Sequence, residues 1–297
     1  MSTETRQWTV ARATITALVE AETARIPVQL FFPAATADDV RRADWLDRGT
    51  AGPDGTIAFR VQAFVVQLGG RTVLVDPCVG NGKQRSLAFW NDLHLPWLDR
   101  FHAAGFATAD TDTVVHTHLH EDHLGWDTHL IDGEWVPTFA AARHVYVDDE
   151  MSYAELDRRR REQDPFADSI EPVMRAGLAD VVAVDADLGD GFRLVPTPGH
   201  TPGHVSLQID GGGDGLVISG DLLHHQFQLG DPSIAEVADW DLDLARSTRA
   251  AFFDDCATRG SIVAGTHFAV EPVGRIEPHA NAWRFRSIPG DPVSAPA

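Results

Sequence analysis

The sequence predicts a layered α/β domain in which helices cover sheets, and three observations support this prediction. The chain has 297 residues, a length that suits either two domains or one large α/β domain. Hydrophobic residues make up 43% and charged residues 23%, which excludes a disordered, collagen-like or membrane-spanning chain. Short strand-like runs alternate with helix-like ones, and no linker long enough to separate two domains interrupts them.

The predicted strands are short runs rich in β-branched and aromatic residues. Residues 59–68 (FRVQAFVVQL) end at the turn signal Gly69-Gly70, and residues 71–75 are expected to form the partner strand of a hairpin. The other predicted strands are residues 111–115, 181–184, 192–195, 216–219 and 261–264.

Helical spacing of apolar residues predicts helices over residues 84–106, 148–163 and 241–259. Four consecutive arginines, Arg158 to Arg161, lie in the second of these and predict a solvated helix face on this acidic background. Residues 24–55 contain three prolines and no clear periodicity. Residues 1–55 are therefore expected to form an arm packed on a main domain of residues 56–297, with a lid over the substrate as one role for it.

Charge and cysteine content exclude several kinds of partner and site. The 24 basic and 44 acidic residues give a net charge of −20, which opposes binding to nucleic acid. Cys78 and Cys256 are too few for a disulfide framework or a cysteine-rich zinc site. The N-terminus shows no secretion signal, and no stretch approaches the ~20 apolar residues that a membrane span needs. We expect a cytoplasmic protein with no membrane partner.

The fourteen histidines are unevenly placed, and the densest group follows a predicted strand. Residues 117–123 have the sequence T-H-L-H-E-D-H and come directly after the apolar residues 113–115. If the strand continues, His118 and His120 point to the same side, because side chains alternate with period two. Two imidazoles so placed can meet one metal ion.

The next two residues that can bind a metal ion follow where the chain turns toward a helix. Asp122 and His123 can reach a second ion beside the first. Four such residues within six positions at a strand end favour a metal site over histidines that only pack or hydrogen bond. His116 shares the parity of His118 and His120 but lies deeper in the strand, so we interpret it as a packed neighbour.

Three later segments each carry a ligand-type residue at the end of an apolar strand. Loops beyond strand ends are the usual place where a rigid sheet assembles a site. Each segment alone is an ordinary turn signal, but together with residues 117–123 they predict one shared site. They are residues 194–204 (LVPTPGHTPGH) with His200 and His204, residues 216–221 (LVISGD) ending on Asp221, and residues 261–267 (SIVAGTH) ending on His267.

These segments resemble the metallo-β-lactamase superfamily, whose hallmark is H-x-H-x-D-H followed by distant His, Asp and His. The resemblance covers about residues 61–267 and includes the motif segments in order. It implies a four-layered αββα sandwich with the site at one sheet edge, and it implies that His204 supports the ligands without joining them. The ligands it implies are His118, His120 and His200 for a first ion, Asp122, His123 and His267 for a second, and Asp221 bridging both.

The ligand set implied by this resemblance consists of nitrogen and oxygen donors only. Such donors suit Zn²⁺ first, with Mn²⁺, Co²⁺ and Fe²⁺ as alternatives. Two such ions can share a hydroxide, because each cation lowers the pKa of bound water toward ~7. The expected reaction is hydrolysis, with the bridging hydroxide as nucleophile and with Asp122 orienting it or passing on its proton.

Differences within the superfamily narrow the expected substrate. His120 stands where diiron oxygen-reducing members have glutamate, and Asp221 stands where some zinc β-lactamases have a cysteine ligand. The nucleases of this fold face a polyanion, which the net charge of −20 opposes. The chain is most similar to the lactonase and esterase branch, which includes N-acyl homoserine lactonases and the methyl parathion hydrolase group. This implies a small apolar lactone or ester as substrate and, by analogy, a homodimer.

Three further residues are candidates for roles in catalysis and substrate binding. His224 stands where many lactonases have a tyrosine, three residues after the bridging aspartate, and we expect it to donate a proton or hydrogen bond to the leaving oxygen. Alternatively, His224 lies at the surface, or it contacts the metal ligands without binding an ion. Trp126 and Phe227 follow the first motif and Asp221 closely, so we expect them to line an apolar substrate pocket.

Four alternative functions stay open. A thioesterase similar to glyoxalase II is expected to add a basic C-terminal domain, and only thirty residues follow His267. A phosphotriesterase of the same fold is a second alternative, and a mononuclear iron dioxygenase acting on persulfides is a third. A non-enzymatic metal-binding protein is the fourth. One iron per chain together with oxygen consumption would identify the dioxygenase.

Overall fold

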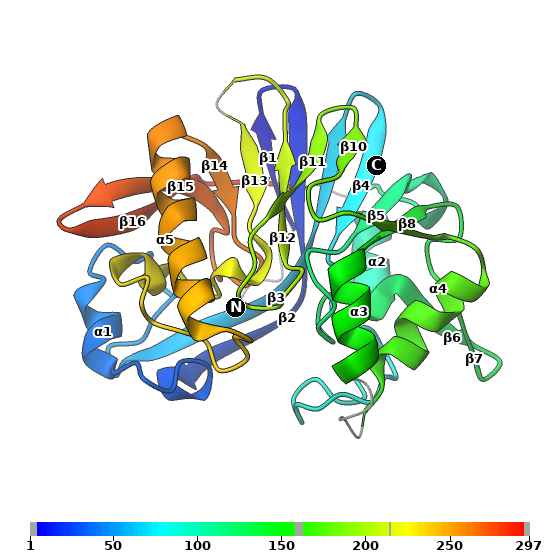
Figure 1. The fold of residues 1–297 in the computed structure, drawn as a ribbon, viewed down its shortest axis with the longest axis horizontal. Coiled ribbons are helices and arrows are strands. Elements are labelled where there is room, and N and C mark those ends of the chain that lie inside the picture. Colours follow the sequence, from blue (N-terminus) through cyan, green and yellow to red (C-terminus); the bar gives the residue numbers. More distant parts are fainter. Residues whose placement is uncertain (1–4, 158–162, 214, 294–297) are drawn as a thin grey trace.

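The computed structural model describes residues 5–157, 163–213 and 215–293, and these fold as a single domain of four layers (Figure 1). An eight-stranded sheet and a seven-stranded sheet pack face to face, and helices lie on the outer side of each sheet (Figure 1). This arrangement confirms the layered α/β class and the αββα sandwich expected from the sequence.

The eight-stranded sheet has the order β17-β1-β2-β3-β4-β5-β8-β9, and the seven-stranded sheet runs from β10 to β16 in chain order. The first sheet contains β1 (Arg6–Val10), β2 (Ala13–Pro27), β3 (Thr56–Leu68), β4 (Arg71–Val75), β5 (Thr113–Val115), β8 (Arg143–Val147), β9 (Ala179–Val182) and β17 (Asp291–Pro292). The second contains β10 (Asp187–Gly189), β11 (Phe192–Pro196), β12 (Val205–Ile209), β13 (Leu216–Ile218), β14 (Ile262–Ala264), β15 (Val273–His279) and β16 (Ala282–Ser287). A separate hairpin consists of β6 (Thr128–Ile131) and β7 (Glu134–Pro137).

Five α-helices lie in the described part of the chain, and they cover both sheets. Helix α5 packs on β15 of the seven-stranded sheet, while α2 contacts β2 and α3 contacts β8 of the other sheet. Among the described residues, no helix combines the length and the apolar character that crossing a membrane would require. The helices are α1 (Ala37–Arg42), α2 (Trp97–Ala103), α3 (Asp148–Asp157), α4 (Glu171–Arg175) and α5 (Leu242–Arg259).

Each strand predicted from the sequence overlaps a strand of the structure. The predicted hairpin is formed by β3 and β4, which pair antiparallel up to Leu68 and Arg71. Gly69 and Gly70 between them have φ values of +61° and +86°, as a tight two-residue hairpin turn requires. Along β3 the side chains alternate, so that Phe64 enters the core between the sheets and Ala63 the core under the helices.

The predicted division at residue 55 does not separate an arm from the domain. Strand β2 pairs antiparallel with β3 from Thr14 opposite Gln67 to Pro27 opposite Thr56. Ile15 of β2 is fully buried in the core between the two sheets. Residues 6–27 are therefore part of the eight-stranded sheet. The apolar side chains on one face of this segment are buried against the seven-stranded sheet, so these residues do not form a separate arm.

The prediction of one helix over residues 84–106 was wrong for its first half, because α2 begins at Trp97. Pro96 precedes it, and a proline disfavours helical backbone in the residue before it. The segment upstream is a loop closed by Asn81 and Leu95, whose side-chain amide and backbone groups hydrogen bond to each other at 2.8 and 2.9 Å.

The other two predicted helices are present. Helix α5 begins one residue after the predicted start and ends at the predicted residue, Arg259. Helix α3 covers the first part of the predicted helix over residues 148–163, up to Asp157. The arginine run Arg158 to Arg161 lies outside the described residues.

Parallel pairing places several strand ends at one edge of the sandwich. Strands β4, β5 and β8 pair in parallel, as do β13 and β14. The carboxyl ends of parallel strands meet at the same edge of a sheet, where loops assemble a site. Beyond these ends come Asp76 after β4, residues 116–123 after β5, Asp221 after β13 and His267 after β14.

Candidate metal centre

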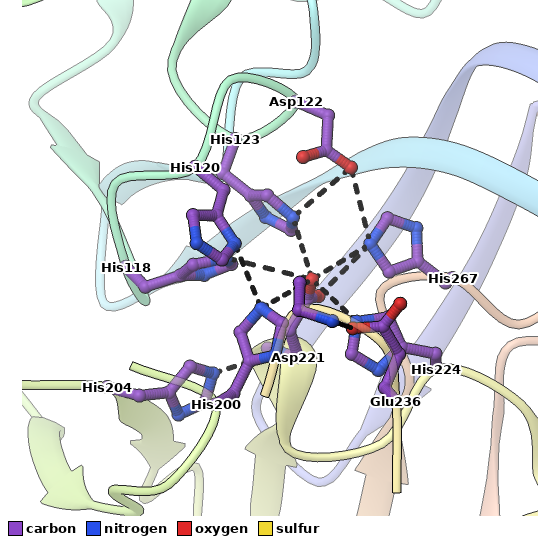
Figure 2. Close-up of polar contacts among 12 residues, drawn as sticks. His118, His120, Asp122, His123, His200, His204, Asp221, His224, Glu236 and His267 are labelled. Atoms are coloured by element: carbon purple, nitrogen blue, oxygen red, sulfur yellow. Dashed lines mark hydrogen bonds and ion pairs between the residues drawn. The ribbon is translucent and has the colours of Figure 1, made fainter. Parts of the chain in front are cut away.

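The structure brings together all seven residues that the sequence singled out as metal ligands (Figure 2). Asp221 lies at their centre, and its carboxylate faces five imidazoles. Burial by itself raises the pKa of Asp221, but these imidazoles, His123 foremost, hold it well below its usual range. The distances from Nε2 to the nearer Asp221 oxygen are 3.1 Å for His224 and His267, 3.2 Å for His123, 3.6 Å for His200 and 3.7 Å for His118.

Two triads of donor atoms flank Asp221. The ring nitrogens of His118, His120 and His200 lie within 4.8 Å of one another, with His200 Nε2 only 2.9 Å from His120 Nδ1. On the other side, Asp122 Oδ2 lies 3.5 Å from Nε2 of both His123 and His267.

The donor atoms fit divalent transition-metal ions. Nε2 of His118, Nε2 of His123 and Oδ1 of Asp221 are buried and have no hydrogen-bond partner among the described residues. Buried polar atoms without a hydrogen bond are costly, and a cation would satisfy all three. Burial, together with the charge of His123, lowers the pKa of His118 well below its usual value, so its ring presents a lone pair. Nitrogen and carboxylate donors without a thiolate suit Zn²⁺, Mn²⁺, Co²⁺ or Fe²⁺.

The strand-based explanation for the first two histidines was wrong. Strand β5 ends at Val115, so His118 and His120 lie in a loop and not on one face of a strand. The ladder stops because the carboxylate of Asp76 accepts hydrogen bonds from Thr117 N at 2.8 Å and from Thr117 Oγ1 at 2.7 Å. The loop geometry, and not strand alternation, brings the two imidazoles together.

Asp76 is a functional residue that the sequence reasoning missed. Besides shaping the loop, its carboxylate lies 3.2 Å from Nδ1 of His123. Its backbone has a φ of +52°, in the left-handed region. The signal was present in the sequence, because R-T-V-L-V-D at residues 71–76 is an apolar strand ending on an aspartate, as in L-V-I-S-G-D.

Two further contacts support the ligands. His267 Nδ1 donates to the carbonyl oxygen of Arg60 at 2.7 Å, which leaves Nε2 facing Asp221. His204 lies beside the cluster, and its Nε2 accepts a hydrogen bond from the backbone N of Asp221 at 2.9 Å. Its Nδ1 contacts Thr197, so both ring nitrogens are used within the protein.

A second buried histidine cluster lies behind the site, but its nitrogens are already used. His116 contacts Val145 O through Nδ1 at 3.0 Å and Asp127 through Nε2 at 2.9 Å. His144 contacts Asp127 through Nδ1 at 3.2 Å and Phe139 O through Nε2 at 3.3 Å. Burial lowers the pKa of His116, but its pairing with Asp127 raises it above the usual value. This cluster is a hydrogen-bonded network in which His116 is a packed neighbour.

A cavity of about 200 Å³ opens onto the centre. Its polar side consists of cluster residues, and its opposite side is mostly apolar. Phe59 stacks on the ring of His267, with centroids 4.3 Å apart. The apolar side is formed by Phe31, Phe59, Leu87, Trp90, Val237 and Ala238, and Ser86, Glu121 and Glu236 also line the cavity.

The prediction that Trp126 and Phe227 line this pocket was wrong, because neither belongs to its lining. Trp126 is buried, stacks on Trp97 and donates Nε1 to Glu20 at 2.6 Å. Phe227 is also buried and packs edge-on against Phe32, with ring centroids 4.9 Å apart. The short helical turns that carry Trp126 and Phe227 direct both side chains into the core.

His224, in contrast, lies at the site. It lines the cavity, and its ring is parallel to that of His267, with centroids 5.4 Å apart. Its Nε2 lies 3.1 Å from Asp221, while its Nδ1 is buried and has no hydrogen-bond partner in the described part of the chain. The position therefore allows either a hydrogen-bond donor to substrate or an additional metal ligand.

Known proteins are similar to this chain in sequence or in fold. Two curated relatives, probable metallo-hydrolases of Mycobacterium bovis and Mycobacterium tuberculosis, are 31% identical over 129 residues, which are 41% of this chain and only 40% of each relative. The hydrolase AbOPH of the β-lactamase superfamily superimposes with a TM-score of 0.78 at 23% identity, over 98% of this chain and 99% of that one. The dizinc quorum-quenching lactonase AidC superimposes with a TM-score of 0.76 at 18% identity, over 96% and 98%.

Because their sequence identity to this chain is low, the solved structures show only that the fold is shared. The sequence model of one family, the metallo-β-lactamase superfamily, matches residues 56–254, which are more than half of the chain. The matched segment contains β3, the loop with residues 117–123, and the residues His200 and Asp221. The chain belongs to the metallo-β-lactamase superfamily.

Proposed function

We propose that this protein is a hydrolase of uncharged carboxylic esters, with lactones as the favoured class, and that it acts through two divalent metal ions. The lining of the cavity carries this proposal. Aromatic and aliphatic side chains face the metal-ligand cluster, and no lysine or arginine is among the described residues that line the cavity. Phosphate monoesters and other anions are normally bound by such cations.

The two triads around Asp221 support a pair of ions. Zn²⁺ is the first choice, with Mn²⁺, Co²⁺ and Fe²⁺ compatible with the same donors. When bound, such ions lower the pKa of water toward ~7 and polarise an acyl oxygen. The residues that would hold them are His118, His120 and His200 on one side, Asp122, His123 and His267 on the other, and Asp221 between them.

The chain's own residues perform the remaining steps of the proposed reaction. Burial raises the pKa of Asp122, but His123 and His267 hold it below its usual value, so the group is an anion that can orient the attacking water. Phe59 and Trp90 hold the apolar part of the ester and exclude bulk water. Glu121 and Glu236 disfavour substrates that carry a carboxylate.

A substrate panel tests this proposal on metal-loaded protein. We expect kcat/KM to be highest for uncharged lactones and carboxylic esters, and lower for the same esters with an added carboxylate. Thioesters and phosphotriesters complete the panel, since both are uncharged and fit the same cavity. Preference for either of these would contradict the ester assignment, and one iron per chain with oxygen consumption would contradict hydrolysis altogether.

The variant His224→Phe tests the proposed hydrogen bond to the leaving oxygen. Phenylalanine keeps the ring volume and the packing against His267 but removes both nitrogens. We expect kcat to fall about a hundredfold, the lower range for loss of a general acid, with an unchanged metal content. The measurements are steady-state kinetics and metal analysis of the same preparation.

Phe32→Leu is the matched control, because Phe32 packs edge-on against His224 and offers no hydrogen-bond donor. We expect this control to keep most of its activity. Full turnover of His224→Phe with intact metal would contradict the proposed role. Loss of metal would instead identify His224 as a ligand, in agreement with its place beside His200 and Asp221.

A further inference from the structure

A buried arginine of helix α5 contacts two of the loops that surround the metal-ligand cluster. Arg249 is fully buried. Its Nη1 donates to Leu222 O at 2.9 Å, directly after Asp221 in the chain, and its Nε donates to Pro232 O at 3.2 Å. Its Nη2 lies 3.4 Å from Oδ2 of Asp239. One guanidinium thus links the Asp221 loop to a carboxylate in another segment.

That carboxylate in turn contacts a proposed metal ligand. Oδ1 of Asp239 lies 3.1 Å from Nδ1 of His200, and Oδ2 accepts a hydrogen bond from the backbone N of Glu236 at 3.0 Å. In a neutral ring, a carboxylate acceptor at Nδ1 favours the proton on that nitrogen and leaves the lone pair on Nε2, which lies 2.9 Å from Nδ1 of His120.

The turn that carries His200 is held against the same helix. Trp240 N donates to His200 O at 3.0 Å, and Asp241 N donates to Gly199 O at 3.0 Å. Gly199 has a φ of +137°, and a Cβ there would lie 2.4 Å from Cα of Ala245 in α5. The distance between α5 and the His200 ring is therefore set by direct backbone packing.

We propose that Asp239 and Arg249 are positioning residues of the metal centre. Asp239 fixes the tautomer and orientation of His200, and Arg249 holds Asp239 and the Asp221 loop at a constant separation. The inference rests on the proposed metal-binding role of the cluster. Lysine cannot replace Arg249, because only the planar guanidinium reaches three acceptors in different directions.

The expected effect is specific to one ligand. Nδ1 of His123 lies 3.2 Å from the carboxylate of Asp76, and Nδ1 of His267 donates to the carbonyl oxygen of Arg60, so neither ring contacts Asp239. Loss of Asp239 should therefore disturb His200 and leave the other two imidazoles in place. A residue that only stabilised the fold would affect all three alike.

The first experiment measures histidine tautomers by ¹⁵N NMR in metal-free protein, with the His200 signals assigned from the spectrum of His200→Gln. In the wild type, we expect His200 to carry its proton on Nδ1. Asp239→Ala should lose this preference, whereas Asp239→Asn should keep much of it, because the amide oxygen can still accept a hydrogen bond from Nδ1. The Asn variant also serves if the Ala variant fails to fold.

The matched control is Asp241→Ala. Asp241 lies two residues away and caps α5 by accepting from Asp243 N at 3.1 Å and Leu244 N at 3.0 Å, without a contact to the His200 ring. Loss of such a cap destabilises the helix. This control therefore weakens the same helix while leaving the Asp239–His200 pair intact.

The second experiment measures metal affinity by competition with a chromophoric chelator. We expect Asp239→Ala and Arg249→Lys to bind Zn²⁺ about 10–100-fold more weakly, as is typical for loss of an outer hydrogen-bond partner. Asp241→Ala should stay within about twofold of the wild type. An unchanged His200 tautomer in Asp239→Ala, or equal losses of affinity in the control, would overturn the positioning role. A wild type that binds no ion would overturn the centre itself, and the tautomer in metal-free protein would still decide the role of Asp239.

Discussion

Replacing Asp221 by alanine is expected to remove bound metal and to abolish hydrolysis. Its carboxylate lies within 3.7 Å of imidazoles from both triads, so it can connect them. A metal ion supplies several kcal/mol of transition-state stabilisation, and its loss corresponds to about 10³-fold or more in kcat. His120→Ala should have the same two effects, because it removes a ring nitrogen from the His118 triad.

Metal analysis and kinetics on the same preparations test this prediction. Asp210→Ala is a suitable control: Asp210 follows β12 at the surface and accepts a hydrogen bond from Gly212 N at 3.0 Å, away from the cluster. The control should keep both metal and turnover. If Asp221→Ala and His120→Ala also kept both, the assignment of the site would be refuted.

Asp127→Asn is expected to have the largest effect on stability. The Asp127 carboxylate is fully buried and is contacted by His116, His144 and the hydroxyl of Tyr146, which donates at 2.9 Å. Removing one partner of a buried charge pair leaves the other charge uncompensated and costs about 3–5 kcal/mol. The free energy of unfolding, measured with denaturant at pH 7, should fall by this amount. The metal content should not change.

The contribution of Asp127 to the free energy of unfolding depends on pH, and its direction follows from the pKa of this carboxyl group. Burial raises the pKa of Asp127, but His116 and His144 hold it far below its ordinary value. The stabilisation is therefore fully present above the unfolded-state pKa of about 3.9 and is lost as the pH falls toward the folded-state value. The difference in stability between wild type and Asp127→Asn should accordingly shrink below about pH 4.

Tyr146→Phe provides the graded comparison, since it removes a single hydrogen bond to the same carboxylate. It should cost about 1 kcal/mol. A stability of Asp127→Asn equal to that of Tyr146→Phe, or a loss of metal from either variant, would show that the His116 cluster is not the purely structural network described here.

Local sequence patterns were sufficient for much of the fold and for the choice of site residues. Residues 59–68 and 71–75 form the predicted hairpin because two glycines supply the turn and β-branched residues supply the strands. Asp221 and His267 were recognisable as polar residues directly after apolar strands. In both cases the pattern that allows the prediction lies within one short continuous stretch of the sequence.

Nearness in the sequence did not determine where side chains point. Trp126 lies three residues after His123 yet stacks on Trp97 in the core. Strand β5 stops before His118 because Asp76, directly after β4, accepts a hydrogen bond from the backbone N of Thr117. The direction of a side chain beyond a strand end depends on the loop's hydrogen-bond partners, and these come from elsewhere in the chain.

The sequence by itself determined the fold class, seven of the strands and the identity of the clustered imidazoles and carboxylates, since propensity and strand-end patterns are local properties. Only the tertiary structure decided that Phe31 and Phe59 line the cavity and that Arg249 of α5 contacts Asp239. These contacts arise when the two sheets and their covering helices pack together. No local pattern specifies them, because their strength comes from burial that exists only in the folded chain.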